Sequence, residues 1–310
     1  MNILAKEKIF IFLFFILIFS CCIENFQKKE ETTITTLQET TSTYETVEFT
    51  TTITTTTIVT KSKLKVHFID VGEGDAILLE KDGLYALIDC GSNYRKIYYY
   101  LYKRNISTLE FLIVTNFRDE HLGACDTVLK NFNVKKIFEN GQIYYTETYR
   151  KYASEIKARN ISTGILSKDN SLKFSDAKIE VLWPKVARPY AEMIKNSIVL
   201  RLGFGDVHFM LMSDCNFECE AQLQGNLSAE ILKVAFSGDK TATSLQFLNK
   251  VNPKIAIISV GKDNIYGHPS LKTLKILEKI EVHRTDNEGT IIVETDGIDF
   301  NILTERMLKY

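Results

Sequence analysis

The chain has 310 residues and a formal net charge of −1, because its 38 Lys and Arg residues nearly balance 39 Asp and Glu residues. A single domain usually takes roughly 100 to 250 residues, so this length provides one domain and an additional segment. The balanced charge argues against the broad positive field that non-specific nucleic-acid binding normally uses. Local basic patches are the alternative, although lysines at such spacing are more often a solvated face: Lys233, Lys240, Lys250 and Lys254.

The additional segment lies at the start of the chain. Lys6 and Lys8 precede an uncharged apolar run over residues 9–23, which is the order of a secretory signal. The run is shorter than the 18 or more apolar residues, roughly, of a membrane span. Residues 18–21, Ile-Phe-Ser-Cys, resemble a lipobox and predict lipidation of Cys21, with an uncleaved anchor as the alternative. Either way, residues 1–23 are expected to attach an extracytoplasmic protein to the cell membrane.

A threonine-rich segment, residues 24–62, follows this signal or anchor. About half of the residues between 32 and 60 are threonine, and none is positively charged. Such a composition buries too little apolar surface to offset the entropy lost on ordering. We expect a disordered stalk, suited to O-glycosylation, that holds a domain of residues 63–310 away from the membrane.

Apolar runs predict a strand-rich first half of this domain. Residues 63–70 alternate between apolar and polar, as in a half-buried strand, and glycine-containing turns separate them from strands at 76–79 and 84–89. Helices and strands alternate from there on. The candidate helices are 96–103, 121–131 and 144–158, and the candidate strands are 111–115, 134–138 and 178–182.

The second half of the domain repeats this mixture of strands and helices. Strands at 197–202 and 207–212 form a predicted hairpin around Gly205 and Asp206. The remaining candidates are helices 215–224, 244–251 and 270–279 and strands 231–234, 254–260 and 289–296, the last expected at a sheet edge. Two strand-rich halves interleaved with helices predict an α/β fold with two sheets inside and helices outside, an αββα four-layer sandwich.

Polar motifs follow several of the predicted strands. They are Asp70-Val-Gly-Glu-Gly-Asp75, Leu87-Ile-Asp-Cys-Gly91, Thr115-Asn-Phe-Arg-Asp-Glu-His121 and Leu211-Met-Ser-Asp214. With a Gly-His-Pro stretch around His268, they resemble motifs of the metallo-β-lactamase superfamily. The most similar branch contains the extracytoplasmic domain of ComEC-type DNA-uptake proteins. The resemblance covers residues 63 to about 293 and implies the metallo-β-lactamase-type sandwich.

The resemblance also implies a site for two metal ions. In such a site, two cations roughly 3.5 to 4 Å apart hold a hydroxide and stabilise charge on the substrate. The family's Thr-His-x-His-x-Asp-His motif aligns with residues 115–121, so Asn116 and Arg118 replace its two early histidines. A guanidinium stays protonated and does not bind a cation. The family's Gly-His-His-Gly-Ser stretch aligns with residues 235–239, which contain no histidine. We therefore predict that the first metal site is lost.

The second metal site is retained in part. Glu120, His121 and Asp214 supply two carboxylates and an imidazole, enough for a single zinc or manganese ion with an open position. The alternative is a salt-bridged remnant without metal, in which Arg118 neutralises Glu120 or Asp214. Asp214 and His268 are candidate remnants of the catalytic machinery, with His268 contacting a phosphate or substrate. Alternatively, His268 only fixes its loop by hydrogen bonds.

Cysteines in the domain predict covalent cross-links: Cys90, Cys125, Cys215 and Cys219. Two of them directly follow the site positions Asp89 and Asp214. Outside the cytoplasm disulfides are the first expectation, and thiolate ligands for a softer metal or buried thiols are the alternatives. The spacing leaves the pairing open.

These features lead to three functional hypotheses. The first is a membrane-tethered pseudoenzyme, similar to ComEC-type hydrolases, that binds or scaffolds a nucleic acid or another envelope component. The second is a phosphodiesterase or nuclease that uses one metal ion held by Glu120, His121 and Asp214, with bound water as the nucleophile. The third is a structural envelope protein that keeps only the fold.

Overall fold

The computed structural model describes residues 62–186 and 193–307. The predicted signal or anchor at residues 1–23, with Cys21, and nearly all of the threonine-rich segment 24–62 lie outside the described residues. Among the residues that are described, no helix combines the length and the apolar character needed to cross a membrane.

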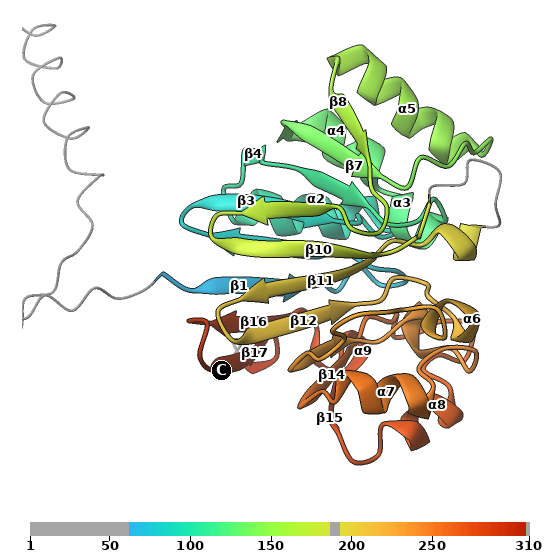
Figure 1. Ribbon diagram of the computed structural model, residues 1–310. Helices are drawn as coiled ribbons and strands as arrows, with labels where there is room; N and C mark the ends of the chain where they lie inside the picture. The colour runs from blue at the N-terminus through green and yellow to red at the C-terminus, as the bar shows by residue number, and fades with distance from the viewer. Residues whose placement is uncertain (1–61, 187–192, 308–310) are drawn as a thin grey trace, which may run out of the picture. The chain divides into compact units, whose positions relative to one another are not determined.

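Two large β-sheets stack face to face (Figure 1). The first has eight strands in the order β17-β16-β1-β2-β3-β5-β7-β8, and the second has seven in the order β15-β14-β13-β12-β11-β10-β9. The strands of the first sheet are β1 (Leu64–Phe68), β2 (Ile77–Lys81), β3 (Leu84–Ile88), β5 (Leu112–Val114), β7 (Lys136–Glu139), β8 (Ser162–Ile165), β16 (Ile291–Thr295) and β17 (Phe300–Thr304). Those of the second are β9 (Ser171–Phe174), β10 (Ala177–Trp183), β11 (Val199–Phe204), β12 (Val207–Leu211), β13 (Ile231–Lys233), β14 (Ile255–Ile258) and β15 (Glu281–Arg284). A small separate sheet pairs β4 (Thr108–Leu109) with β6 (Asn133–Val134).

Helices cover the outer faces of the two sheets, which confirms the four-layer αββα prediction (Figure 1). Along the first half of the domain they are α2 (Tyr94–Lys103), α3 (Asp119–Leu122), α4 (Cys125–Asn131) and α5 (Glu147–Arg159). Along the second half they are α6 (Phe217–Glu220), α7 (Leu245–Val251), α8 (Leu271–Ile276) and α9 (Thr285–Glu288), with short 3-10 turns η1 (Met193–Asn196) and η2 (Phe236–Gly238).

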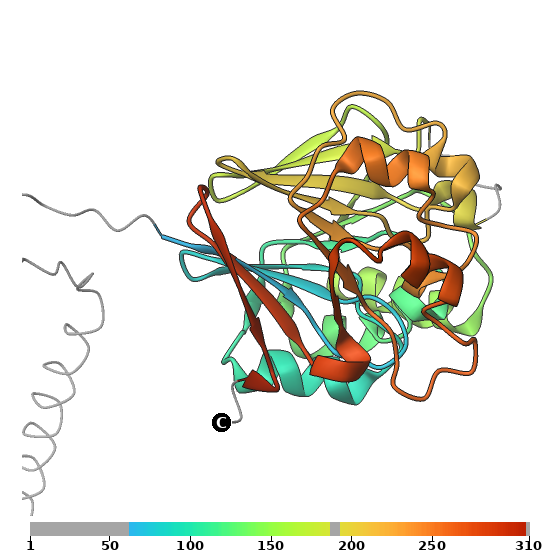
Figure 2. The same cartoon turned by 90° about the horizontal axis from the view of Figure 1, so that it is seen from below.

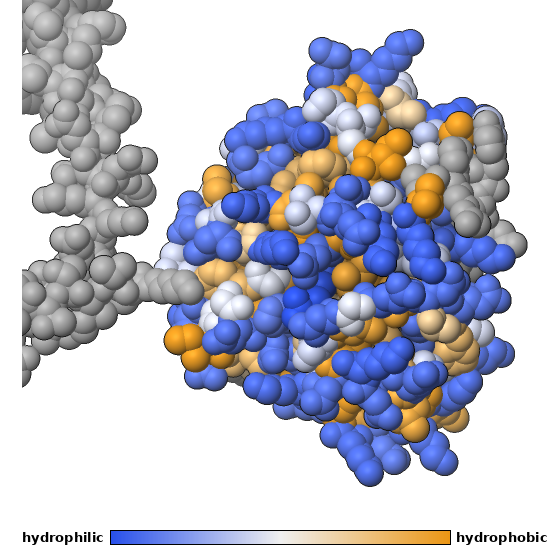
Figure 3. Space-filling model, viewed as in Figure 1, coloured by the Kyte–Doolittle hydropathy of each residue, from blue (hydrophilic) through white to orange (hydrophobic). Residues whose placement is uncertain are grey.

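A hydrophobic core fills the space between the sheets. Leu64, Val66 and Phe68 alternate along β1 and are fully buried, as the period of two in a strand requires. They belong to the same cluster as Leu200 and Phe209 of the opposite sheet. Full burial of one such side chain stabilises the fold by about 1.5–3 kcal/mol. The outer surface is different: Figure 3 shows hydrophilic side chains over most of the viewed face, with smaller apolar patches between them.

Three predicted elements differ from the structure. Residues 289–296 were predicted to form an edge strand, but β16 lies inside the sheet, between β1 and the unpredicted β17. The Asp296 carboxylate accepts hydrogen bonds from the backbone N–H groups of Ile298 and Asp299, and this turn makes the β16–β17 hairpin. The predicted helix 121–131 is divided into α3 and α4, and the predicted helix 215–224 is reduced to the single turn of α6.

The topology brings the ends of several strands to one edge of the sandwich. β3 and β5 run parallel in the first sheet, and β12 and β13 run parallel in the second. The carboxyl ends of parallel neighbours lie at the same edge, so the loops that carry the polar motifs meet there.

Candidate functional site

A cavity of about 240 Å³ lies where these loops meet. Among the described residues, five acidic side chains line it, against Arg118 and two histidines: Glu73, Asp75, Glu120, Asp214 and Asp239. The cavity therefore carries a negative field, which attracts cations and repels phosphate.

Arg118 crosses this cavity and joins two of its acids. Nη1 lies 3.1 Å from Oδ2 of Asp214, and Nη2 lies 3.1 Å from Oε1 of Glu120. The guanidinium also lies over the ring of Phe236, 4.7 Å from its centroid. The salt-bridged remnant predicted from the sequence has Arg118 paired with Glu120 or Asp214. In the structure Arg118 is paired with both.

Asn116 shapes the loop that presents Arg118. Its amide donates a hydrogen bond to Ser197 Oγ at 2.8 Å, and its Oδ1 accepts one from the backbone N–H of Arg118 at 2.9 Å. Asn116 is fully buried. Its side chain therefore organises the loop and is occupied by protein partners.

His121, on α3, lies between two carboxylates. Its Nδ1 is 2.8 Å from Oδ2 of Asp89, and its Nε2 is 3.1 Å from Oδ1 of Asp214. Asp89 follows β3 and also accepts hydrogen bonds from the backbone N–H and the hydroxyl of Thr115. All of these side chains are buried. The imidazole is therefore fixed at both nitrogens by groups of this chain.

Burial and charge act in opposite directions on this group. Burial lowers the pKa of His121, but the Asp214 and Asp89 carboxylates outweigh it and raise that pKa well above its usual value. Burial raises the pKa of Asp214, but His121 and Arg118 bring it below its usual value. For Asp89 burial dominates and raises the pKa. His121 and Asp214 therefore each stabilise the charged form of the other.

Lys233 is placed differently from the sequence prediction. Its ammonium group is fully buried and lies 2.7 Å from Oδ1 of Asp75, and it also donates to the carbonyl oxygen of Val234 at 3.1 Å. The prediction of a solvated lysine was wrong, because the opposite sheet supplies a buried acid at this point. A buried lysine is stable in the charged form only with such a partner.

The loop before β2 packs directly on α3. The N–H of Asp75 donates to the carbonyl oxygen of Glu120 at 2.9 Å. A Cβ atom at Gly74 would lie 1.9 Å from the same oxygen, and the φ angle of Gly74 is +104°. Only glycine allows this close approach.

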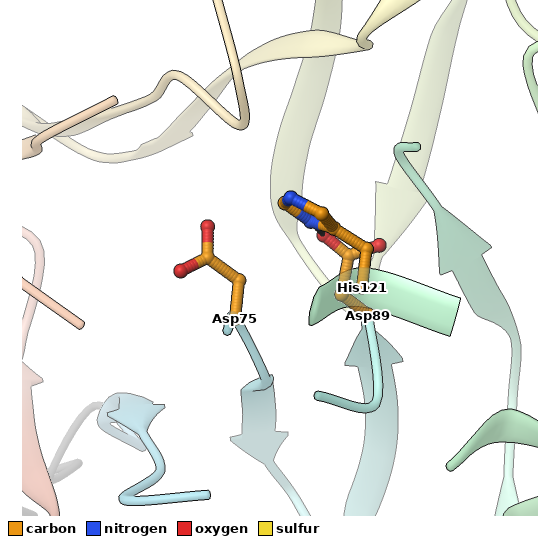
Figure 4. A group of neighbouring side chains, drawn as sticks. All are labelled: Asp75, Asp89 and His121. Atoms are coloured by element: carbon orange, nitrogen blue, oxygen red, sulfur yellow. Dashed lines mark hydrogen bonds and ion pairs between the residues drawn. The ribbon is translucent and has the colours of Figure 1, made fainter. Parts of the chain in front are cut away.

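The group of side chains that could hold a metal ion differs from the predicted group. Among the described residues, the donor atoms of Asp75, Asp89 and His121 lie within 4.8 Å of one another, and Figure 4 shows Asp89 next to His121 while Asp75 stands apart. The prediction placed Glu120 and Asp214 with His121, and the structure instead turns Glu120 toward Arg118. Asp75 is paired with Lys233, and Asp89 with Thr115 and His121.

The donor set does not fit a two-metal centre. Asn116 and Arg118 take the place of the early histidines, and Arg118 and Lys233 are ion-paired with carboxylates that would otherwise be ligands. One cation between His121 Nε2 and Asp214 Oδ1 would share Asp214 with Arg118, which is paired with the other carboxylate oxygen.

His268 lines the same cavity as Asp214. Its Nε2 lies 3.1 Å from Oδ2 of Asp239, and its ring stacks on Tyr266. Its backbone N–H donates to Oδ1 of Asn264, whose amide donates back to the His268 carbonyl oxygen. The structure therefore contains the loop-fixing hydrogen bonds. The role of Asp214 and His268 as catalytic remnants stays a prediction.

Both pairs of cysteines form disulfides. Cys90 is bonded to Cys125, and Cys215 to Cys219. The first joins the residue after Asp89 to the start of α4, and the Cys90 N–H also donates to the His121 carbonyl oxygen. Cys215 follows Asp214. The disulfide expectation is confirmed, and the bonds brace the loops that carry the His121 group.

Two hydroxyl groups were missed in the sequence. Thr115 Oγ lies 2.7 Å from Ser213 Oγ, so it links the loop after β5 to the loop after β12 as well as binding Asp89. A signal was available in the sequence, because both residues belong to polar motifs that directly follow buried strands.

No family model matches the chain. "ComE operon protein 3" of Bacillus subtilis is 28% identical over 256 residues, covering 74% of this chain and 33% of the relative. "Recombination protein 2" of Haemophilus influenzae is 26% identical over 253 residues, covering 78% and 29%. "Competence protein ComA" of Neisseria gonorrhoeae is 25% identical over 247 residues, covering 75% and 32%. The chain spans about a third of the length of these curated relatives.

Solved structures with a similar fold support the predicted fold class. The metallo-β-lactamase fold protein YhfI from Bacillus subtilis superposes with a TM-score of 0.51 at 12% identity, covering 76% of this chain and all of that chain. A mutant of the CmlA β-hydroxylase gives a TM-score of 0.50 at 7% identity, covering 75% and 54%. At such identities the likeness shows the fold alone.

Proposed function

We propose that this protein has a binding or scaffolding role and does not catalyse two-metal hydrolysis. The chain has a metallo-β-lactamase fold, and its sequence relatives are competence proteins of the ComEC family. The observation that carries the proposal is the pairing of Arg118 with both Glu120 and Asp214. A guanidinium at this point supplies the positive charge that metal ions supply in a dinuclear site.

Asp214 is more deeply buried than its partner Arg118. Its side chain is 5% exposed, while that of Arg118 is 22% exposed. Removing one partner from a buried ion pair costs about 3–5 kcal/mol, because the other charge is left without compensation. A metal ion that displaced Arg118 would have to offset the loss of this pairing. The arrangement therefore favours the metal-free state.

We also propose that the domain lies outside the cytoplasm, attached through residues 1–23 and the threonine-rich segment 24–62. The two disulfides support this location, since such bonds persist in oxidising compartments. Protease treatment of intact cells should remove the domain from the cell surface. Protection of the domain until the membrane is permeabilised would contradict the location.

The second candidate is a hydrolase with one zinc or manganese ion held by Glu120, His121 and Asp214. It is favoured by one observation: His121 Nε2 and Asp214 Oδ1 are 3.1 Å apart, and both residues line the cavity. In this case Arg118 would swing away, and the ion would activate a water molecule.

Elemental analysis of the untagged, purified full-length protein separates the two candidates. We expect far less than one zinc or manganese ion per chain, with no change in a His121→Ala variant. No hydrolysis of a phosphodiester such as bis(p-nitrophenyl) phosphate is expected with either metal added. Stoichiometric metal that disappears in His121→Ala, together with chelator-sensitive hydrolysis lost in Asp214→Ala, would replace the binding role with the hydrolase.

A further inference from the structure

A second cavity, of about 590 Å³, lies against helix α2. The helix forms one wall, and Asp70, Thr290, Ile292 and Glu305 form the other. In Figure 2, seen from below, the dark red strand β17 ends beside the teal helix α2. None of its lining residues belongs to the cavity around Arg118. We call this second cavity the α2 groove.

The groove is cationic although the chain as a whole is slightly negative. Four basic residues line it, against the carboxylates of Asp70 and Glu305, which leaves an excess of two positive charges: Arg95, Lys96, Lys103 and Arg104. Lys96 pairs with Asp70 at 2.8 Å. In the described part of the chain, Arg95 and Lys103 form no ion pair with a carboxylate. The groove therefore attracts anions, whereas the acidic cavity around Arg118 repels them.

The helix also presents aromatic rings to the groove. Ile97 and Leu101 bury one face of α2 in the core, which leaves residues at other positions facing outward. Tyr99 lines the groove and is 55% exposed. It lies between Lys96 and Lys103 at helical spacings of three and four residues, so the ring and the two ammonium groups share a face.

Tyr100 forms a fixed part of the wall. Its hydroxyl lies 2.8 Å from Nδ1 of the buried His67, and the guanidinium of Arg104 lies 3.9 Å from its ring centroid. Such a contact holds the guanidinium in place by cation–π attraction. The groove thus has a rigid cationic wall at Arg104 and an exposed ring at Tyr99.

From these contacts we infer that the α2 groove binds a nucleotide unit, with its phosphate near Lys96 and Lys103 and its base stacked on Tyr99. Flat bases stack on exposed aromatic rings regardless of sequence, and cationic side chains beside them follow the phosphates. The volume falls in the range of about 300–1,000 Å³ that is usual for ligand cavities. Free nucleotides and single-stranded nucleic acid both present this chemistry. The inference rests on the proposed binding role and names a ligand for it.

Fluorescence anisotropy on the purified full-length protein tests the groove. The probes are a labelled oligothymidylate and labelled thymidine monophosphate, at several salt concentrations. We expect binding at low salt, weakened on the order of 5- to 150-fold in Tyr99→Ala, because stacking accounts for that much per base. Lys103→Gln should lower the slope of log K against log salt by about 0.7, as expected when one phosphate contact is lost.

Matched variants localise the effect. Tyr102 lies on the same helix, is 61% exposed and does not line the groove, so Tyr102→Ala should bind like the wild type. Lys250→Gln, on α7, is the corresponding charge control. Equal losses in Tyr102→Ala and Tyr99→Ala would overturn the assignment, as would the absence of binding by both probes at low salt.

Further probes show which ligand the groove binds and whether the base contributes to binding. Tighter binding of the oligomer indicates single-stranded nucleic acid, and equal binding of the monophosphate indicates a free nucleotide, and either result supports the groove. Equal affinity for an abasic phosphodiester oligomer or for anionic phospholipid vesicles would overturn base stacking. The metal analysis is independent of this outcome: stoichiometric metal with intact, Tyr99-dependent binding would refute only the metal-free proposal.

Discussion

The ammonium group of Lys233 lies 2.7 Å from Oδ1 of Asp75, and both side chains are buried. Lys233 ends β13 in the second sheet, while Asp75 belongs to the loop before β2 in the first. The ion pair therefore connects the two halves of the sandwich, and its Asp75 also lines the cavity around Arg118. Arg118 makes a similar connection, from the loop before α3 to Asp214 after β12.

Lys233→Met should destabilise the domain by about 3–5 kcal/mol, because it leaves the Asp75 carboxylate buried without a partner. Urea denaturation followed by circular dichroism measures the change. The double variant Lys233→Met/Asp75→Asn removes both charges and should recover much of the lost stability. A double variant no more stable than the single one would show that the lysine acts through packing.

Arg118→Ala should increase the affinity of the cavity for a divalent metal ion. Removing the guanidinium takes one positive charge away from Glu120 and Asp214, next to His121, and metal ions bind such oxygen and nitrogen donors. Isothermal titration with zinc and manganese should show tighter binding to the variant than to the wild type. Arg95→Ala, which removes an exposed arginine on α2, is the control. Equal metal affinity in wild type and Arg118→Ala would remove the basis for the charge-replacement argument.

Reduction of the two disulfides should destabilise the domain unequally. The Cys90–Cys125 bond closes a loop with a sequence separation of 35, and the Cys215–Cys219 bond one of 4. From the loop-closure entropy of the unfolded chain, the first bond stabilises the fold by about 4 kcal/mol and the second by about 2 kcal/mol. Denaturation of the Cys90→Ala/Cys125→Ala and Cys215→Ala/Cys219→Ala variants should show this order. The reverse order would indicate that strain or local packing dominates the loop effect.

The raised pKa of His121 predicts a pH-dependent contribution to stability. The folded protein holds the proton more tightly than the unfolded chain, so the contribution is complete below the unfolded histidine pKa of about 6.5. It declines as the pH rises through the raised folded pKa. The difference in unfolding free energy between wild type and His121→Gln should therefore shrink from pH 6 toward alkaline pH. A difference that grows with pH would mean that His121 is neutral when folded.

The alternation of apolar residues in strands such as β1 and β12 determined the two-sheet architecture. Each such strand gives its sheet one apolar face, and the apolar faces of the two sheets are buried against each other. The sequence also predicted the loss of the early histidines, since Asn116 and Arg118 lie within a short motif whose other positions are recognisable, and that loss stays a prediction. It predicted the ion pairing of Arg118 as one of two alternatives, because an arginine and acids lie close together along the chain.

Tertiary structure alone decided which partners each charge has. Lys233 is separated from Asp75 by more than half of the domain sequence, so no local pattern distinguishes it from a solvated lysine, and only the packing of one sheet on the other buries the pair. The same holds for the α2 groove, because Thr290, Ile292 and Glu305 in its second wall come from the far end of the domain. Charge and hydropathy along a chain predict its layers, but the distances between side chains depend on how those layers are stacked.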